Sequence, residues 1–160
     1  MRDNINIILC ERTDDTITNI NNIFDTITTD KDGKVSFTTV VFINTIEEYY
    51  KKLGLYFYIE KVDAGKITYL GSLEYASQEG KQFSNGETEY GSRPHSNQSI
   101  STFDVVDFNM LGAGSYEMQV YKYTDEEVVN LADKELEECI EFATDDKLVA
   151  TYAFFVEDYK

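Results

Sequence analysis

Carboxylates near the carboxyl end of the chain are the residues best suited to binding chemistry. Residues 125–160 hold 12 acidic side chains and three lysines, so −9 of the formal net charge of −16 lies there. On a helix, Asp133, Glu137 and Glu141 would stack four residues apart, and like charges at that spacing are destabilising. Asp145 and Asp146 would oppose the helix dipole at its carboxyl end. Stability alone would favour lysines here, so the pattern indicates contact with a basic or cationic surface.

The expected partner-binding residues are Glu126, Asp133, Glu137, Glu138, Glu141, Asp145 and Asp146. A solvated face of a generally acidic protein explains the same residues and stays open as the alternative. Direct binding of nucleic acid is not expected, because it requires a positively charged surface.

Asp30 and Asp32 are the candidate metal ligands. Together with Gly33 they match the third, fifth and sixth positions of an EF-hand calcium loop. The match then fails, because Thr28 and Thr39 would stand at the first and twelfth positions, where the loop needs carboxylates. A polar turn between two strands explains the same residues better, so we expect no metal site.

No catalytic constellation can be assembled from the sequence. It offers no arguable Ser–His–Asp arrangement, no Cys/His metal spacing and no phosphate loop. The single histidine, His95, has no second metal-binding residue beside it. The many carboxylates leave a two-acid glycosidase open, although nothing singles out a pair. We therefore expect a protein that is not an enzyme and uses no cofactor.

The late carboxylates are expected to lie on an amphipathic helix at 125–143. Thr124 and Glu127 have the form of a capping box at its start, and apolar residues recur behind them at helical spacing. These residues are Val128, Ala132, Leu136, Cys139, Ile140 and Ala143. A second, shorter helix is expected at about 46–53.

The rest of the chain is predicted to be β-sheet, organised around a hairpin at 55–75. Two runs rich in aromatic and branched residues flank a polar turn there. Alternation places Leu55, Phe57 and Ile59 on one face, and Tyr56, Tyr58 and Val62 on the other. Both faces are apolar, so the hairpin must lie in a sheet that other parts of the chain cover. Further strands are expected at 5–10, 35–43, 100–110, 117–123 and 148–156.

Residues 16–27 carry two conflicting signals. Apolar residues recur there at helical spacing, but the residues between them are mostly Thr and Asn, which favour strands or turns. We predict a bent or bulged strand, with a helix as the alternative.

Length and composition indicate one domain over residues 1–160. Hydrophobic residues make up 42% of the chain and Phe and Tyr together number 22, so the chain can bury a core. A polar stretch at 77–99 is expected to be a functional or mobile loop. Cys10 and Cys139 lie in apolar patterns and are expected to be buried, reduced thiols. We see neither a signal peptide nor an apolar run that could span a membrane, so we expect a cytoplasmic protein.

Four short motifs carry a resemblance to a known family: Asn6-Ile-Ile-Leu-Cys10, Ile20-Asn-Asn-Ile-Phe-Asp25, Gly114-Ser-Tyr-Glu-Met-Gln-Val120 and Phe154-Phe-Val156. With them the chain resembles a family of uncharacterised bacterial immunoglobulin-like β-sandwich proteins. The resemblance implies a mainly β fold, an antiparallel sandwich of about seven to eight strands, and carries over no functional residue. The acidic helix departs from the pattern, because a tight hairpin would be expected between the last two strands.

We expect a non-catalytic protein-interaction module that contacts a basic protein surface through the acidic segment at 125–146. Two alternatives stay open. The chain could be a decoy from a phage or mobile element that mimics nucleic-acid charge and occupies a groove on a host protein. It could instead be a structural homo-oligomer in which an exposed strand edge pairs with a second copy. No membrane partner is expected.

Overall fold

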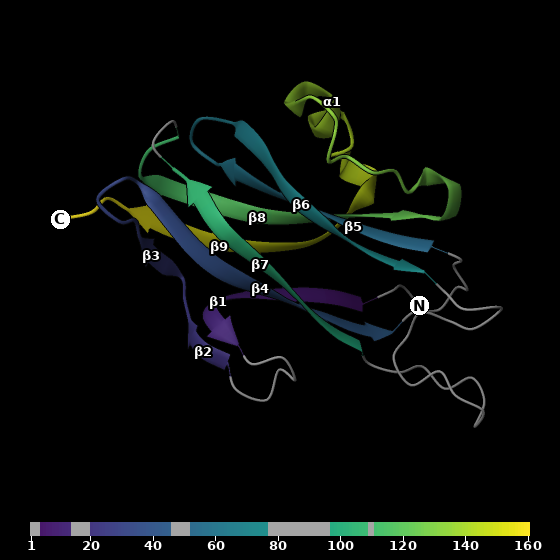
Figure 1. Cartoon of the computed structure of the whole chain (residues 1–160), viewed down its shortest axis with the longest axis horizontal. Helices are drawn as coiled ribbons and strands as arrows, with labels where there is room; N and C mark the ends of the chain where they lie inside the picture. The colour runs from purple at the N-terminus through teal and green to yellow at the C-terminus, as the bar shows by residue number, and fades with distance from the viewer. Residues whose placement is uncertain (1–3, 14–19, 46–51, 77–96, 109–110) are drawn as a thin grey trace.

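The computed structural model describes residues 4–13, 20–45, 52–76, 97–108 and 111–160, and these form two stacked β-sheets (Figure 1). The first sheet contains β1 (Asn4–Thr13), β2 (Ile20–Ile23), β4 (Lys34–Thr45) and β7 (Asn97–Asp107). The second contains β3 (Thr26–Thr28), β5 (Lys52–Lys61), β6 (Lys66–Ala76), β8 (Gly114–Thr124) and β9 (Leu148–Glu157). The strand orders are β2-β1-β4-β7 and β3-β9-β8-β5-β6, and only the β3–β9 pair is parallel among the described strands.

The core fills the space between the two sheets, because alternate residues of each strand face inward. β1 contributes Ile5, Ile7 and Leu9 to this core. β4 lies between β1 and β7 and contributes Phe37 and Val41. The second sheet contributes Ile27, Leu53, Leu55, Phe57, Ile59, Tyr116, Met118, Val120, Phe154 and Val156. Burying one such side chain stabilises the fold by about 1.5–3 kcal/mol.

From β4 to β8 the chain crosses between the sheets three times, and the successive strands pair in a Greek-key order. The orders β1-β4-β7 and β9-β8-β5-β6 are those of an immunoglobulin-like sandwich. Tyr116, near the start of β8, donates its hydroxyl hydrogen to the backbone carbonyl of Gly112. This contact is the tyrosine corner found in that fold. The predicted immunoglobulin-like β-sandwich is confirmed, with nine strands in the described part of the chain.

The central hairpin is confirmed as β5 and β6. Its turn closes with Gly65, which has a φ of 62° and donates its amide hydrogen to the carbonyl of Lys61 at 2.8 Å. Every β5 residue from Leu53 to Ile59 is buried, so both faces of the strand are covered. The first sheet covers one face, and the segment that joins β8 to β9 covers the other.

The bent strand predicted at 16–27 is confirmed for its described residues. β2 and β3 are separated by a bend at Phe24 and Asp25, and Asn22 has a φ of 54°. The bend moves the chain from one sheet to the other, because β2 pairs with β1 whereas β3 pairs with β9. Residues 16–19 lie outside the described residues.

The long acidic helix predicted at 125–143 is wrong in its extent. Residues 125–147, which we call the acidic strap, contain two single 3-10 turns, η1 (Asp125–Glu127) and η2 (Asp145–Lys147). The only α-helix of the strap is α1 (Leu136–Glu141). Figure 1 shows α1 on the side of β5, β6 and β8 that faces away from the first sheet.

Contacts with the sheet explain why the helix does not begin earlier. Tyr56 of β5 hydrogen-bonds both the amide and the carbonyl of Val129, and the Asn130 side chain accepts the amide hydrogen of Ala132 at 2.9 Å. These backbone groups therefore have partners outside a helical ladder. No side-chain cap forms at Thr124, so the predicted capping box is wrong.

The predicted apolar stripe is correct only in part. Val128, Cys139 and Ala143 pack on the sheet, but Ala132 is exposed and Leu136 is 49% exposed. Leu131, which the helical spacing omits, is only 1% exposed.

Two further predictions fall largely outside the described residues. Of the short helix at about 46–53, only Lys52 and Leu53 are described, and both belong to β5, where Leu53 is buried in the core. Of the polar loop at 77–99, Asn97, Gln98 and Ser99 are described and pair with β4 as the start of β7, so the loop prediction ends too late. Backbone pairing with β4 does not depend on apolar side chains, so the polar composition of residues 97–99 wrongly indicated a loop where β7 begins.

Candidate functional site

The acidic strap packs on the outer face of the second sheet, where its apolar side chains contact tyrosines of β5 and β8. Leu131 and Cys139 of the strap are buried there, at 1% and 2% exposed. They belong to a cluster with four tyrosines of β5 and β8, namely Tyr56, Tyr58, Tyr121 and Tyr123. Because side chains alternate along a strand, these tyrosines all point away from the core between the sheets. The strap therefore forms a third layer with a small core of its own.

Three tyrosine hydroxyls donate hydrogen bonds to backbone carbonyls of the strap. Tyr56 donates to Val129 at 2.6 Å, Tyr58 donates to Cys139 at 2.5 Å, and Tyr123 donates to Phe142 at 2.5 Å. The hydroxyl of Tyr56 also accepts the amide hydrogen of Val129 at 2.9 Å. Burial raises the pKa of the Tyr56 and Tyr58 hydroxyls, so both remain neutral donors. The bonds hold the strap at both ends and at α1.

Ring contacts add to this attachment. The rings of Tyr56 and Tyr123 meet edge to face at 5.5 Å, and those of Tyr58 and Tyr121 do so at 5.2 Å. Phe142 of the strap stacks on Tyr56 with centroids 6.2 Å apart. Such pairs contribute about 0.5–1.5 kcal/mol each beyond the area they bury. The strap is therefore fixed on the sheet by apolar, aromatic and hydrogen-bonded contacts together.

The opposite surface of the strap is acidic. Residues 125–147 contain ten carboxylates and two lysines, a net charge of −8. All seven predicted partner-binding residues are exposed: Glu126, Asp133, Glu137, Glu138, Glu141, Asp145 and Asp146. Glu126 lies in η1, three glutamates lie in α1, and the two late aspartates lie in η2.

Each strap lysine pairs with a strap glutamate. Lys147 lies 3.1 Å from a carboxylate oxygen of Glu127 and 5.3 Å from the ring centre of Tyr123. This pair joins η1 to η2 and brings the two ends of the strap together. Lys134 lies 3.8 Å from Glu138, and both side chains are about half exposed, so this pair contributes little.

Two glutamates of the sheet extend the acidic surface beyond the strap. Glu60 of β5 lies opposite Glu117 of β8, and both accept hydrogen bonds from the buried Gln119 amide, at 2.7 Å and 2.9 Å. Burial, together with the negative charges of Asp145, Glu60 and Glu117, raises the pKa of Tyr121 to about 12. Carboxylates of the strap and of two strands thus act on one hydroxyl. The sequence did not identify the Glu60–Glu117 pair, because the pairing depends on the register of β5 against β8.

Asp30 and Asp32 lie in the turn between β3 and β4, which confirms the turn interpretation. The Asp30 Oδ1 atom accepts the amide hydrogens of Asp32 at 2.8 Å and of Lys34 at 3.0 Å. The bond from Lys34, followed by the bond from Asp32, lowers the pKa of the Asp30 carboxyl. Within the described ranges, no three Asp, Glu, His or Cys side chains form a group that could hold a metal ion.

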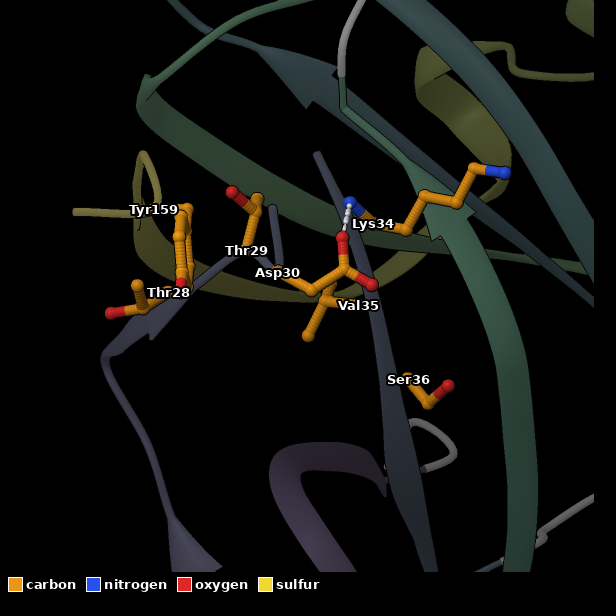
Figure 2. A pocket seen from close by; sticks show the side chains of 7 residues that line it. All are labelled: Thr28, Thr29, Asp30, Lys34, Val35, Ser36 and Tyr159. Carbon is orange, nitrogen blue, oxygen red and sulfur yellow. Dashed lines mark hydrogen bonds between the residues drawn. The ribbon is translucent and has the colours of Figure 1, made fainter. Parts of the chain in front are cut away.

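A shallow pocket of about 550 Å³ opens beside this turn (Figure 2). Its lining residues are Thr28, Thr29, Asp30, Lys34, Val35, Ser36 and Tyr159. Figure 2 shows Tyr159 beside Thr28 and Thr29, with Asp30 and Val35 next to them and the Lys34 side chain extending away from Tyr159. None of the pocket residues apart from Asp30 was a predicted site residue.

The fold places the chain among immunoglobulin-like β-sandwich proteins, and comparison with known proteins adds little to that class. No protein-family model and no curated protein matches the sequence. Among solved structures, the chain is similar to a CARDB domain from Pyrococcus furiosus, crystallised in complex with di-metal ions. The identity is 9%, the match covers 97% of this chain and 87% of that chain, and the TM-score is 0.42. No helix among the described residues is long and apolar enough to cross a membrane.

Proposed function

We propose that this protein is a non-catalytic interaction module that binds a basic protein surface through the acidic strap. The observation that carries the proposal is the two-sided character of residues 125–147. Their apolar side chains pack on the tyrosines of the sheet, whereas all seven partner-binding carboxylates are exposed. Charge that served only solubility would have no need of a fixed support.

The attachment of the strap supports binding rather than a loosely solvated segment. Its backbone is held at Val129, Cys139 and Phe142, so the exposed carboxylates keep a defined spacing. A preorganised surface loses less conformational entropy when a partner binds. The predicted stack of three carboxylates is wrong, because Asp133 lies before α1, and Asp145 and Asp146 begin η2 rather than end a helix. The repulsion that remains, between Glu137 and Glu141 on α1, is understandable if a cationic partner neutralises them.

The test compares two variants that each remove three negative charges. The strap variant carries Glu137→Gln, Glu138→Gln and Glu141→Gln, all on exposed residues of α1. The control variant carries Asp25→Asn, Asp63→Asn and Asp158→Asn, on exposed residues outside the strap. Binding to an immobilised peptide rich in Lys and Arg, and retention of proteins from a cell lysate, are measured at low and high salt.

We expect the strap variant to lose binding and the control variant to keep it, with binding by the unmodified protein falling as salt rises. Equal loss in both variants would mean that net charge alone attracts the peptide. Equal retention in both would remove the strap as the binding surface. If the protein is instead a decoy for nucleic acid, added nucleic acid should compete with this chain for the partner retained from the lysate.

A further inference from the structure

The pocket between β3, β4 and the chain after β9 combines an aromatic ring with fixed polar groups. Tyr159 lines it with its side chain, and the residue is 62% exposed. The amide of Thr29 donates to the carbonyl of Glu157 at 3.0 Å, which ties the end of β9 to the turn that carries the polar groups. The ring of Tyr159 thus follows a strand end that is held beside the turn, and its exposed face can stack on a ligand.

We propose that this pocket binds one unit of a neutral saccharide. A pyranose ring has an apolar face of C–H groups and a rim of hydroxyls, so it needs an aromatic or aliphatic surface beside hydrogen-bonding groups. Tyr159 and Val35 supply the apolar surface, while Thr28, Ser36 and Asp30 supply the polar one. The volume of about 550 Å³ lies in the usual range of about 300–1,000 Å³ for small-molecule sites.

Asp30 is the group best placed to fix the orientation of the sugar. Two backbone amides hold its Oδ1 atom, so the carboxylate is oriented before any ligand arrives. A carboxylate has about four lone-pair positions, so Oδ2 can accept hydrogen bonds from ligand hydroxyls. Asp30 stays ionised at neutral pH because the bonds from Lys34 and Asp32 lower its pKa.

The charge of the site restricts the class of sugar. Asp30 is the only carboxylate and Lys34 the only cation among the lining residues, but the Lys34 side chain extends away from Tyr159 (Figure 2), and the whole chain carries a formal charge of −16. A phosphorylated or acidic sugar stacked on Tyr159 would be repelled by Asp30 and by the net charge of the chain. Since the pocket is open and few groups line it, the affinity should be weak, in the millimolar range.

The test is a titration of the ¹⁵N-labelled full chain with glucose, galactose, mannose, N-acetylglucosamine and adenosine, followed by amide chemical shifts. We expect saturable shifts for at least one sugar, confined to residues 28–36 and the last residues of the chain. Tyr159→Ala should lower the affinity at least tenfold, while Tyr159→Phe should keep it, because stacking uses the ring. Asp30→Asn keeps an acceptor for the turn amides and should weaken binding severalfold.

Phe155→Ala is the matched control, because Phe155 is another partly exposed aromatic residue, at 42%, and lies outside this pocket. It should leave the affinity unchanged. The spectrum of each free variant shows directly whether it is folded, and the exposure of Tyr159 makes unfolding unexpected. No saturable shift with any sugar, binding of adenosine alone, or equal affinity in Tyr159→Ala would each overturn the proposal.

Discussion

The hydroxyl of Tyr56 donates a hydrogen bond to the carbonyl oxygen of Val129 at 2.6 Å and accepts one from the amide of the same residue at 2.9 Å. One side chain of the sheet thus satisfies both backbone groups of one strap residue, 73 positions along the chain. Tyr56 is itself fully buried. The path of the strap is therefore set by the sheet beneath it rather than by its own helical preference.

Replacing Tyr56 with Phe should destabilise the strap. The substitution keeps the ring contacts but leaves the amide and carbonyl of Val129 without this partner, which costs about 1–3 kcal/mol. We expect that loss in the free energy of unfolding by urea, and faster hydrogen exchange at the Val129 amide. Tyr159→Phe, on an exposed ring, is the control and should change stability by less than about 0.5 kcal/mol. Unchanged exchange at Val129 would show that the bond does not hold the strap.

Gly54 of β5 lies under the strap where there is little room for a side chain. A Cβ atom there would lie 3.0 Å from Cε2 of Tyr56 and 3.1 Å from Cγ1 of Val128. Gly54→Ala should therefore lower the free energy of unfolding by about 1–3 kcal/mol through overpacking. In a Val128→Ala background part of this cost should disappear, because the closest strap atom is gone.

Gly65→Ala provides the comparison for that double-mutant cycle. Nothing lies within 4 Å of a Cβ atom at this position, but its φ of 62° strains any side chain. Its cost of about 1 kcal/mol should be the same with Val128 or Ala at position 128. If the costs of Gly54→Ala and Val128→Ala were additive, a side chain at position 54 would not be in steric conflict with Val128.

The β framework could be predicted because its signals are local. Alternation correctly divided the buried residues of β5 between two faces, and the apolar character of both faces correctly required a cover on each side. The bent strand at 16–27 could be predicted because the Thr and Asn residues there favour strands or turns, and this preference outweighed the helical spacing of the apolar residues. What sequence reasoning lacked was register, so neither the bulge that places Tyr58 opposite Tyr69 nor the Glu60–Glu117 pair could be seen.

The strap could be predicted in composition but not in conformation. The exposure of all seven carboxylates agrees with the amphipathic pattern, yet the helix that was to carry them is six residues long. Helical spacing describes a segment in isolation, whereas Tyr56 and Tyr58 determine where the strap can place its backbone. Outward-facing tyrosines at alternate positions, 56 and 58 in β5 and 121 and 123 in β8, were the signal for this attachment.

Stability should fall in alkaline solution because buried tyrosines resist ionisation in the folded state. Burial raises the pKa of Tyr116 and of Tyr121 to about 12, whereas an unfolded tyrosine ionises near pH 10. Between these values the unfolded chain releases protons that the folded chain keeps, so the free energy of unfolding falls with pH. The stabilisation is complete below about pH 10 and is lost as pH rises through about 12, at no more than about 1.4 kcal/mol per pH unit for each tyrosine.

Urea unfolding at a series of pH values from neutral to about 11 measures this slope. Tyr121→Phe removes one of the groups together with its 2.7 Å bond to Gln119, so it should be less stable at neutral pH but show a shallower decline. A variant that declines as steeply as the unmodified protein would contradict the assignment of the slope to Tyr121.

Replacing Glu141 with Lys should raise stability and weaken partner binding at the same time. Glu137 and Glu141 lie four residues apart at the start and end of α1, whose last turn holds no basic residue. A lysine at 141 would convert this repulsive pair into an attractive one. Its positive charge would also interact favourably with the negative end of the helix dipole, and the two effects together should raise the free energy of unfolding by about 0.3–1 kcal/mol. The same lysine would repel a basic surface, so binding to the immobilised basic peptide should fall at low salt. Asp25→Lys, on an exposed residue at the bend between β2 and β3 and away from the strap, should give neither effect. A gain in stability without any loss of binding would mean that the charge on α1 is not retained for a partner, and the function proposed for the strap would lose its support.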